Sequence, residues 1–177
     1  MAVPTTPTVP PAEVLALVHA AATELATLLP SAVPLTVTDV VSAGPAPDAV
    51  AVRASFVGAV SAELVLVADQ AVAEALAGAG GAVSLADALR PALEAAASVM
   101  GAGVLDAAVA GPLGSDLEDD DVAAVGLVDP EVVPRAWFGM RVRTRPDAVP
   151  HQREQPAVAP PRGVARPGAH PGAKPAA

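Results

Sequence analysis

The chain has 177 residues, enough for one domain with a hydrophobic core, and 53% of them are hydrophobic but only 2% aromatic. It contains no cysteine, which excludes disulfides, thiolate metal sites and thiol nucleophiles. Its net charge of −9 is unevenly divided, because residues 1–140 hold three cations and 17 acids whereas residues 141–177 hold seven cations and two acids. A body this acidic repels nucleic acid and anionic membranes, so neither is expected as a partner.

The N-terminal half predicts one helix followed by three strands. Residues 1–11 contain four prolines and are expected to form a disordered leader. From Ala12 to Leu29 apolar residues recur at spacings of three and four, which is typical of an amphipathic helix, and Pro30 ends it. Alternating or apolar runs predict strands over 35–41, 50–57 and 60–67. The last two runs are so closely spaced that they favour an antiparallel hairpin.

The C-terminal half predicts two helices and two further strands. Asp69 is expected to cap a helix that ends at Gly78, and Ser84 is expected to cap a second helix that runs to Met100. Pro91 should break or kink that second helix, or begin another one. A loop is predicted over 110–121, and strands over 122–128 and 135–143.

This order of elements predicts an α+β fold, with a mainly antiparallel sheet and long helices on one face. The domain is expected to span residues 12–144. Residues 145–177 are rich in Pro, Arg and Gly and keep no hydrophobic period, so they are expected to form a disordered tail. No run is long and apolar enough for a transmembrane helix, and we expect a cytoplasmic protein.

Few side chains are arranged for chemistry. The acidic run at 116–121 lacks the glycine and the distal glutamate of a calcium loop, so a solvated loop is expected there. Arg141 and Arg143 share one face of a strand, where they would bind a phosphate or an acidic partner, or guard an exposed edge. We identify no catalytic residue, no metal site and no cofactor site.

The two long helices resemble those of the CheC/CheX/FliY superfamily, the phosphatase-like domains of bacterial chemotaxis and of the flagellar motor switch. One helix reads Glu13-Val14-Leu15-Ala16 and the other Arg90-Pro91-Ala92-Leu93-Glu94-Ala95-Ala96-Ala97. The family pattern is Asp or Ser, three residues, Glu, two residues and Asn. The resemblance covers residues 12–144 and is greatest to the N-terminal domain of FliN/FliY-type switch proteins. It implies a pseudo-twofold fold.

In that family the Asn amide orients the water that attacks the aspartyl phosphate of CheY, and the Glu contacts a lysine of CheY. Glu13 and Glu94 match the Glu, whereas Ala16 and Ala97 stand where Asn is expected. An Ala methyl group forms no hydrogen bond, so a degenerate phosphatase that is not an enzyme is expected. Glu13, Glu94, Arg141 and Arg143 are then the candidate partner-binding residues.

The resemblance implies a motor-switch or chemotaxis module that acts by protein–protein interaction. Its partners would be flagellar switch proteins or a CheY-type response regulator, and it would lie peripherally at the flagellar basal body. Two alternatives remain open. One is a CheY-phosphate phosphatase of the CheC/CheX type, and the other is an unrelated α+β binding domain.

Overall fold

The computed structural model describes residues 12–39, 44–46, 48–78 and 83–143. All of them belong to one unit. The expected leader (1–11) and tail (145–177) lie outside the described residues. The elements, in chain order, are α1 (Ala12–Ala26), β1 (Thr36–Thr38), β2 (Val50–Gly58), β3 (Ser61–Ala68), α2 (Gln70–Gly78), α3 (Leu85–Ser98), β4 (Gly103–Leu105), β5 (Val109–Pro112), β6 (Ala123–Val128) and β7 (Pro134–Arg143).

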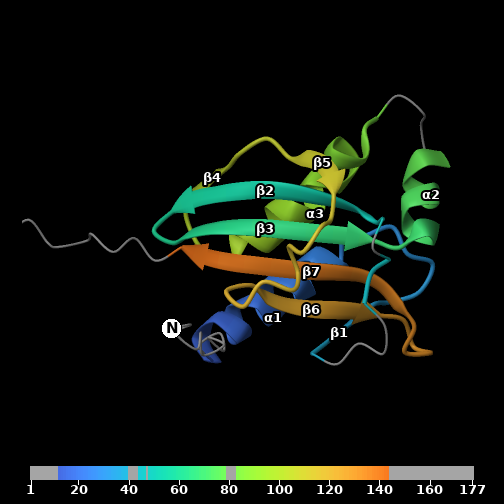
Figure 1. Ribbon diagram of the computed structural model, residues 1–177, viewed down its shortest axis with the longest axis horizontal. Helices are drawn as coiled ribbons and strands as arrows, with labels where there is room; N and C mark the ends of the chain where they lie inside the picture. The colour runs from blue at the N-terminus through green and yellow to red at the C-terminus, as the bar shows by residue number, and fades with distance from the viewer. Residues whose placement is uncertain (1–11, 40–43, 47, 79–82, 144–177) are drawn as a thin grey trace, which may run out of the picture. The chain divides into compact units, whose positions relative to one another are not determined.

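The strands form one antiparallel sheet in the order β1-β6-β7-β3-β2-β4, with β5 also paired to β2. Figure 1 shows α1 and α3 on the same face of this sheet, whereas α2 lies beyond one end of the strands. The predicted α+β class and the predicted 50–57/60–67 hairpin are therefore confirmed.

The sheet has a pseudo-twofold symmetry, because exchanging the strands of the N-terminal half for those of the C-terminal half reverses the strand order and leaves the pattern unchanged. One half consists of α1 followed by β1, β2 and β3, and the other of α3 followed by the pair β4 and β5, then β6 and β7. Strands β3 and β7 are neighbours at the centre, β2 and β6 flank them, and β1 and β4 form the edges. This arrangement is the pseudo-twofold fold that the resemblance implies.

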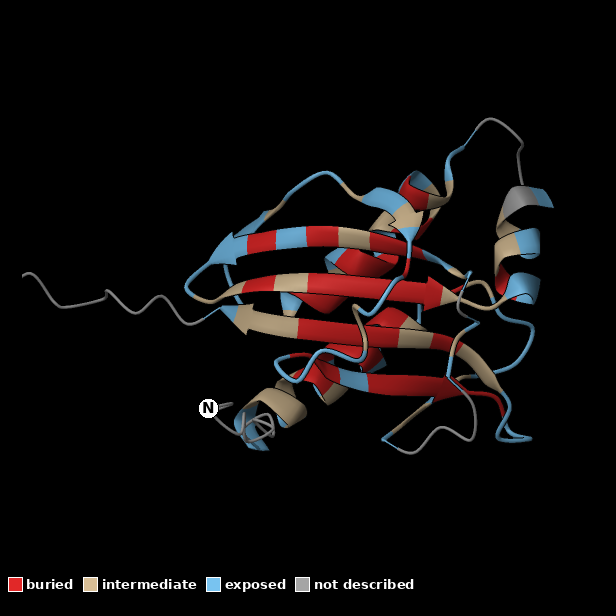
Figure 2. Cartoon of the chain, viewed as in Figure 1, coloured by how far each residue is buried: buried red, intermediate tan, exposed pale blue. Residues whose placement is uncertain are grey.

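The main core lies between the two helices and the sheet, and aliphatic residues supply nearly all of it. Because side chains alternate along a strand, the two neighbouring rings of β7 point to opposite faces. Phe138 is fully buried in the main core, while Trp137 packs against a smaller cluster on the open face. Figure 2 shows buried residues on every long strand and on the sheet-facing sides of α1 and α3. The largest fully buried side chains are Phe138, Leu25, Leu64, Leu66, Leu89, Leu93, Leu127 and Met140.

Both predicted helix caps are present. The backbone N–H of Val72 donates to Asp69 Oδ1 at 2.8 Å, and that of Asp87 donates to Ser84 Oγ at 3.1 Å. Each bond satisfies one of the donors that the first helical turn leaves unpaired.

Three local predictions were wrong in whole or in part. The helix α3 continues through Pro91, so it neither breaks nor begins anew there, and a kink at Pro91 stays a prediction. Pro91 is exposed, so the carbonyl group that it leaves without a partner lies on the outer side. The first helix ends at Ala26 rather than at residue 29. The short strands β4 and β5 were not predicted, and β5 includes residues expected to be loop.

Candidate functional site

The helix α3 presents a charged pair on its outer surface. Arg90 and Glu94 are one helical turn apart, and Arg90 Nε donates to Glu94 Oε1 at 2.8 Å. The Glu94 side chain is 53% exposed, so its carboxylate can reach a partner. Ala97, one turn further on, is buried.

A hollow of about 360 Å³ lies beside this pair, and we call it the α3 hollow. Its walls come from the C-terminal part of α3 and from β4. Glycine at position 103 makes the wall possible, because an added Cβ would lie 2.7 Å from Phe56 Cε2 and 2.8 Å from the Val57 carbonyl oxygen. The lining residues are Phe56, Glu94, Ala97, Ser98, Gly101, Gly103, Val104 and Leu105.

The polar groups of the α3 hollow suit a cationic or hydrogen-bonding group of a partner. Glu94 contributes a carboxylate, and Ser98 contributes a hydroxyl whose proton is donated to the Ala95 carbonyl oxygen at 2.6 Å. Gln70 carries the one amide side chain among the described residues. It lies on α2, where its Nε2 donates to Glu74 Oε1 at 2.7 Å. Among the described residues, no side-chain amide therefore lies beside Glu94.

The two long helices repeat one burial pattern with a shift of 71 residues. The shift superimposes four pairs of buried helical positions, which are Val18 and Leu89, Ala21 and Ala92, Ala22 and Leu93, and Leu25 and Ala96, and a fifth pair just after the helices, Leu29 and Met100. It brings Glu94 onto Thr23 and Ala97 onto Ala26. Glu13 lies in the first turn of α1 and is exposed, in register with Ser84. Thr23, which the sequence pattern missed, is thus the structural counterpart of Glu94.

The other two predicted partner-binding residues are on β7. Arg141 reaches Glu63 at 3.3 Å, Asp119 at 2.6 Å and Asp121 at 2.8 Å. Arg143 is 66% exposed and pairs with Glu63 at 3.0 Å. Both residues lie on the face of the sheet opposite to α3, because they alternate along β7 with core residues that face the helices. A role of Glu13, Arg141 or Arg143 in partner binding stays a prediction.

The acidic run 116–121 is an exposed loop, as expected, but three of its carboxylates also form ion pairs. Asp116 pairs with Arg53 of β2, and Asp119 and Asp121 pair with Arg141 of β7. Leu113, just before this run, and Leu117 within it pack in one cluster with Ala51, Val65, Val67 and Trp137. The acidic residues therefore hold a loop across the open face of the sheet.

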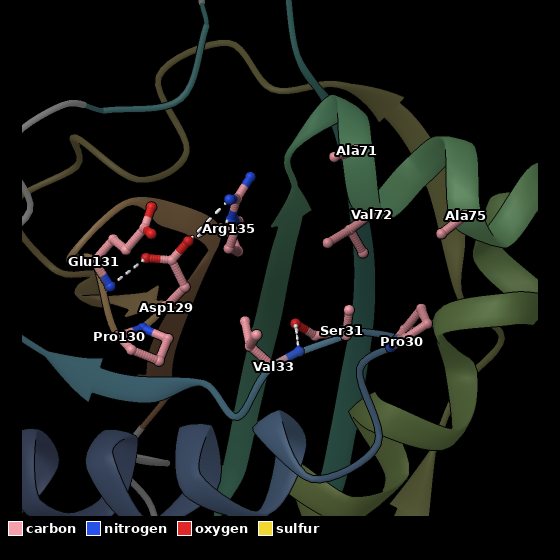
Figure 3. Close-up of a pocket in the computed structure, with 11 residues that line it drawn as sticks. Pro30, Ser31, Val33, Ala71, Val72, Ala75, Asp129, Pro130, Glu131 and Arg135 are labelled. Atoms are coloured by element: carbon pink, nitrogen blue, oxygen red, sulfur yellow. Dashed lines mark hydrogen bonds and ion pairs between the residues drawn. The ribbon is translucent and has the colours of Figure 1, made fainter.

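A second hollow, of about 520 Å³, lies between the α1–β1 loop, α2 and the β6–β7 turn (Figure 3). Its charged groups are mostly paired with one another. Arg135 Nη2 donates to Asp129 Oδ2 at 2.8 Å, and Arg135 Nη1 reaches Asp69 Oδ2 at 3.3 Å. This arrangement joins the β6–β7 turn to the N-terminus of α2, so we interpret it as a structural brace.

Hydrogen bonds set the ionisation of the buried carboxylate of this brace. The bond from the Val133 backbone N–H is the largest cause that holds the pKa of Asp129 below its ordinary value, against the effect of burial. Arg135 and the Glu131 N–H lower that pKa further. The bonds to Asp129 and Asp69 in turn raise the pKa of Arg135 above its ordinary value.

No helix among the described residues is long and apolar enough to cross a membrane. No family model matches the chain, and no curated protein matches it.

Several solved structures are similar to it at low sequence identity. The chemotaxis protein CheX from Vibrio vulnificus is 14% identical over 72% of this chain and 96% of that one, with a TM-score of 0.44. CheX from Borrelia burgdorferi, solved in a CheX-CheY-BeF3-Mg²⁺ complex, is 13% identical over 72% of this chain and 96% of that one, with a TM-score of 0.44. FliY from Thermotoga maritima is 15% identical over 72% of this chain and 84% of that one, with a TM-score of 0.45.

These likenesses agree with the predicted resemblance to CheC/CheX/FliY-type proteins and correct one expectation drawn from it. The replacement of the family Asn by Ala predicted that the chain is not an enzyme. That prediction is contradicted, because the similar structures include CheX, the type to which the resemblance assigns CheY-phosphate phosphatase activity.

Proposed function

We propose that this chain is a chemotaxis or motor-switch module that acts by binding another protein, and that the rim of the α3 hollow is its docking site. One observation carries the proposal. Glu94 is the residue that matches the partner-contacting Glu of the resembling family, and its carboxylate is half-exposed at the mouth of the α3 hollow. A charged side chain beside a hollow with apolar walls is a typical anchor for a complementary side chain.

The chemistry of the rim suggests the class of partner. Glu94 offers a carboxylate to a cationic side chain, and the resemblance assigns this contact to a lysine of a CheY-type response regulator. The acidic charge of residues 1–140 favours the approach of such a cationic surface. We therefore infer a CheY-type response regulator as the partner, with flagellar switch proteins as the other partner class to be tested, and a cytoplasmic site of action.

The proposal is tested by titrating the full chain with a CheY-type response regulator from the same organism, with and without beryllofluoride, and with the switch proteins. Glu94→Gln keeps the size of the side chain and removes its charge, and it should weaken the complex by about tenfold, or about 1.4 kcal/mol. Glu24→Gln is the matched control, because Glu24 is exposed on α1 and does not line either hollow. Equal affinity of Glu94→Gln and wild type would contradict the proposal.

The second candidate function is hydrolysis of the aspartyl phosphate of the same response regulator. The observation that favours it is that Glu94 and the Ser98 hydroxyl line one hollow, so that two oxygen ligands for a water molecule lie together. The test is the rate of phosphate loss from the phosphorylated regulator. A faster loss that disappears in both Glu94→Gln and Ser98→Ala supports this function. A rate equal to that of the regulator alone rejects it and leaves the binding proposal in place.

A further inference from the structure

The open face of the sheet carries an apolar strip that crosses three neighbouring strands. Ala51 of β2, Val67 of β3 and Trp137 of β7 are cross-strand neighbours. Val65 lies two residues from Val67 on β3 and so faces the same side. Ala51, Val65 and Val67 are buried, although α1 and α3 cover the other side of the sheet. A different part of the chain therefore shields the strip from water.

Residues 113–122, which we call the strap, provide this cover. The strap runs from β5 to β6 and passes across the face of the sheet that is turned away from the long helices (Figure 1). Leu113 and Leu117 belong to the same apolar cluster as the strip. Gly139 of β7 makes room for the strap, because a Cβ added there would lie 2.5 Å from Leu117 Cδ2.

Two arginines of the sheet hold the strap. Arg53 of β2 pairs with Asp116. Arg141 of β7 holds the C-terminal part, with Nη2 at 2.6 Å from Asp119 Oδ2 and Nε at 2.8 Å from Asp121 Oδ2. Ion pairs, rather than a ladder of backbone hydrogen bonds, thus join these acidic residues to the sheet.

These ion pairs are weak holds. The side chains of Asp116, Asp119 and Asp121 are 32%, 43% and 63% exposed. Ion pairs that water reaches contribute little to stability, and dissolved salt screens them. A backbone bond of the strap such as that from the Val122 N–H to the Asp119 carbonyl oxygen, at 3.0 Å, is local and does not involve the sheet. The strap therefore loses much less than a strand does when it leaves the sheet.

We propose that the strap is a salt-sensitive cover, which opens as a local unit and exposes the apolar strip while the helices and the sheet stay folded. Segments with few buried apolar contacts open at a lower free-energy cost than the core around them. The inference goes beyond the proposed function and does not involve the α3 hollow. It makes the open face an apolar surface that the chain can cover or present.

The test uses an introduced thiol as a reporter of opening, because the chain has no cysteine of its own. Val65→Cys places the thiol under the strap, and Val52→Cys places the same side chain in the main core, on the other face of the sheet. Both full-length variants are treated with iodoacetamide, which is uncharged. The thiol in Val65→Cys should react at least about tenfold faster than that in Val52→Cys. Raising NaCl from about 0.05 M to about 1 M should increase the ratio of the two rates by about threefold.

A matched pair of double variants, made in the Val65→Cys background, separates the ion pairs from the net charge. Asp119→Asn, Asp121→Asn removes both of the strap carboxylates that Arg141 holds, and it should speed the reaction by about fivefold. Glu118→Gln, Asp120→Asn removes two exposed acids of the same strap that neither arginine holds, and it should change the rate by less than about twofold.

Three results would overturn the inference. Equal rates in Val65→Cys and Val52→Cys would mean that the strip is exposed only by global unfolding. A rate ratio that salt leaves unchanged, or equal acceleration by both double variants, would mean that the ion pairs do not hold the strap. Ala51→Cys, in the same cluster, is the second reporter if circular dichroism shows that Val65→Cys disturbs the fold. No partner is present in this experiment, so its failure would leave the proposed function in place.

Discussion

The α1 half and the α3 half of this domain share a backbone plan and a burial pattern, but they differ at exposed positions of their long helices. Four pairs of buried positions match between the two helices, and even large and small side chains are exchanged in a compensating way. Ala22 corresponds to Leu93, whereas Leu25 corresponds to Ala96. Outside the core, Thr23 corresponds to Glu94 and His19 to Arg90.

This difference teaches that the fold and the site depend on different residues. Packing against the sheet needs only apolar side chains of the right total volume at the buried positions. The exposed positions are free of that requirement, so a few of them can give the α3 half a charged pair that the α1 half does not have. Substitutions of buried residues should therefore have larger effects on stability than substitutions of exposed ones.

The largest expected effect is in the shared core. Leu93→Ala removes a fully buried side chain from α3 and should lower the free energy of unfolding by about 2–5 kcal/mol, because it leaves a cavity between helix and sheet. Urea denaturation measures this change. Ala22→Leu can be added to Leu93→Ala to return the lost side-chain volume at the matching position of α1. Full recovery of stability would mean that the core requires only the total volume and not its position. We expect at most partial recovery, because the compensating atoms come from the other helix.

The wall of the α3 hollow should be the next most sensitive feature. Gly103→Ala introduces a Cβ that meets the buried Phe56 ring and should cost about 1–3 kcal/mol of unfolding free energy. It should also weaken partner binding by displacing β4. Gly44→Ala is the control, because nothing lies within 4 Å of its added Cβ, and it should change stability by less than about 0.5 kcal/mol. Equal stabilities of the two variants would contradict this account of the wall.

The β6–β7 turn should affect the stability of the fold only at acid pH. It contains the buried carboxylate of Asp129, whereas the β2–β3 turn contains no carboxylate. Folding lowers the pKa of Asp129, so its contribution to stability is present above its ordinary value and is lost as the pH falls through the folded value. Thermal unfolding between pH 6 and pH 2 should therefore depend less steeply on pH in Asp129→Asn than in wild type. An unchanged slope would show that this carboxylate has the same pKa in both states.

The smallest effects are expected on the open face. Arg141→Met removes ion pairs to three carboxylates and should cost about 1 kcal/mol, decreasing with added salt. Arg143→Met removes one exposed pair and should cost less than about 0.5 kcal/mol. Partner affinity measured on the same two variants tests their predicted binding role. A loss with Arg143→Met at unchanged stability would support a second contact surface.

Much of the fold was predictable because it depends on local signals. The period of apolar residues predicted both long helices, and alternation with short spacing predicted the β2–β3 hairpin. The strands β4 and β5 were missed because they have only three and four residues and exist through their pairing with β2. The break predicted at Pro91 was likewise wrong for a tertiary reason, because the packing of α3 on the sheet outweighs one lost backbone hydrogen bond.

The site was less predictable, because it depends on register rather than on motif. Glu13 and Glu94 begin similar four-residue strings, but the burial of the helices matches Glu94 to Thr23. A comparison of the two apolar patterns, rather than of the two strings, contains the signal that identifies Thr23. The pairing of the acidic loop with Arg53 and Arg141 joins residues 63 and 22 positions apart, which no local pattern indicates.

The central claim is that the carboxylate of Glu94 makes the α3 hollow the docking site of this domain. The most direct test is a calorimetric titration of wild type and Glu94→Gln with a beryllofluoride-activated CheY-type response regulator. We predict one site per wild-type chain and an affinity about tenfold lower in Glu94→Gln. Two equal sites in wild type, or the same affinity in both proteins, would contradict the claim.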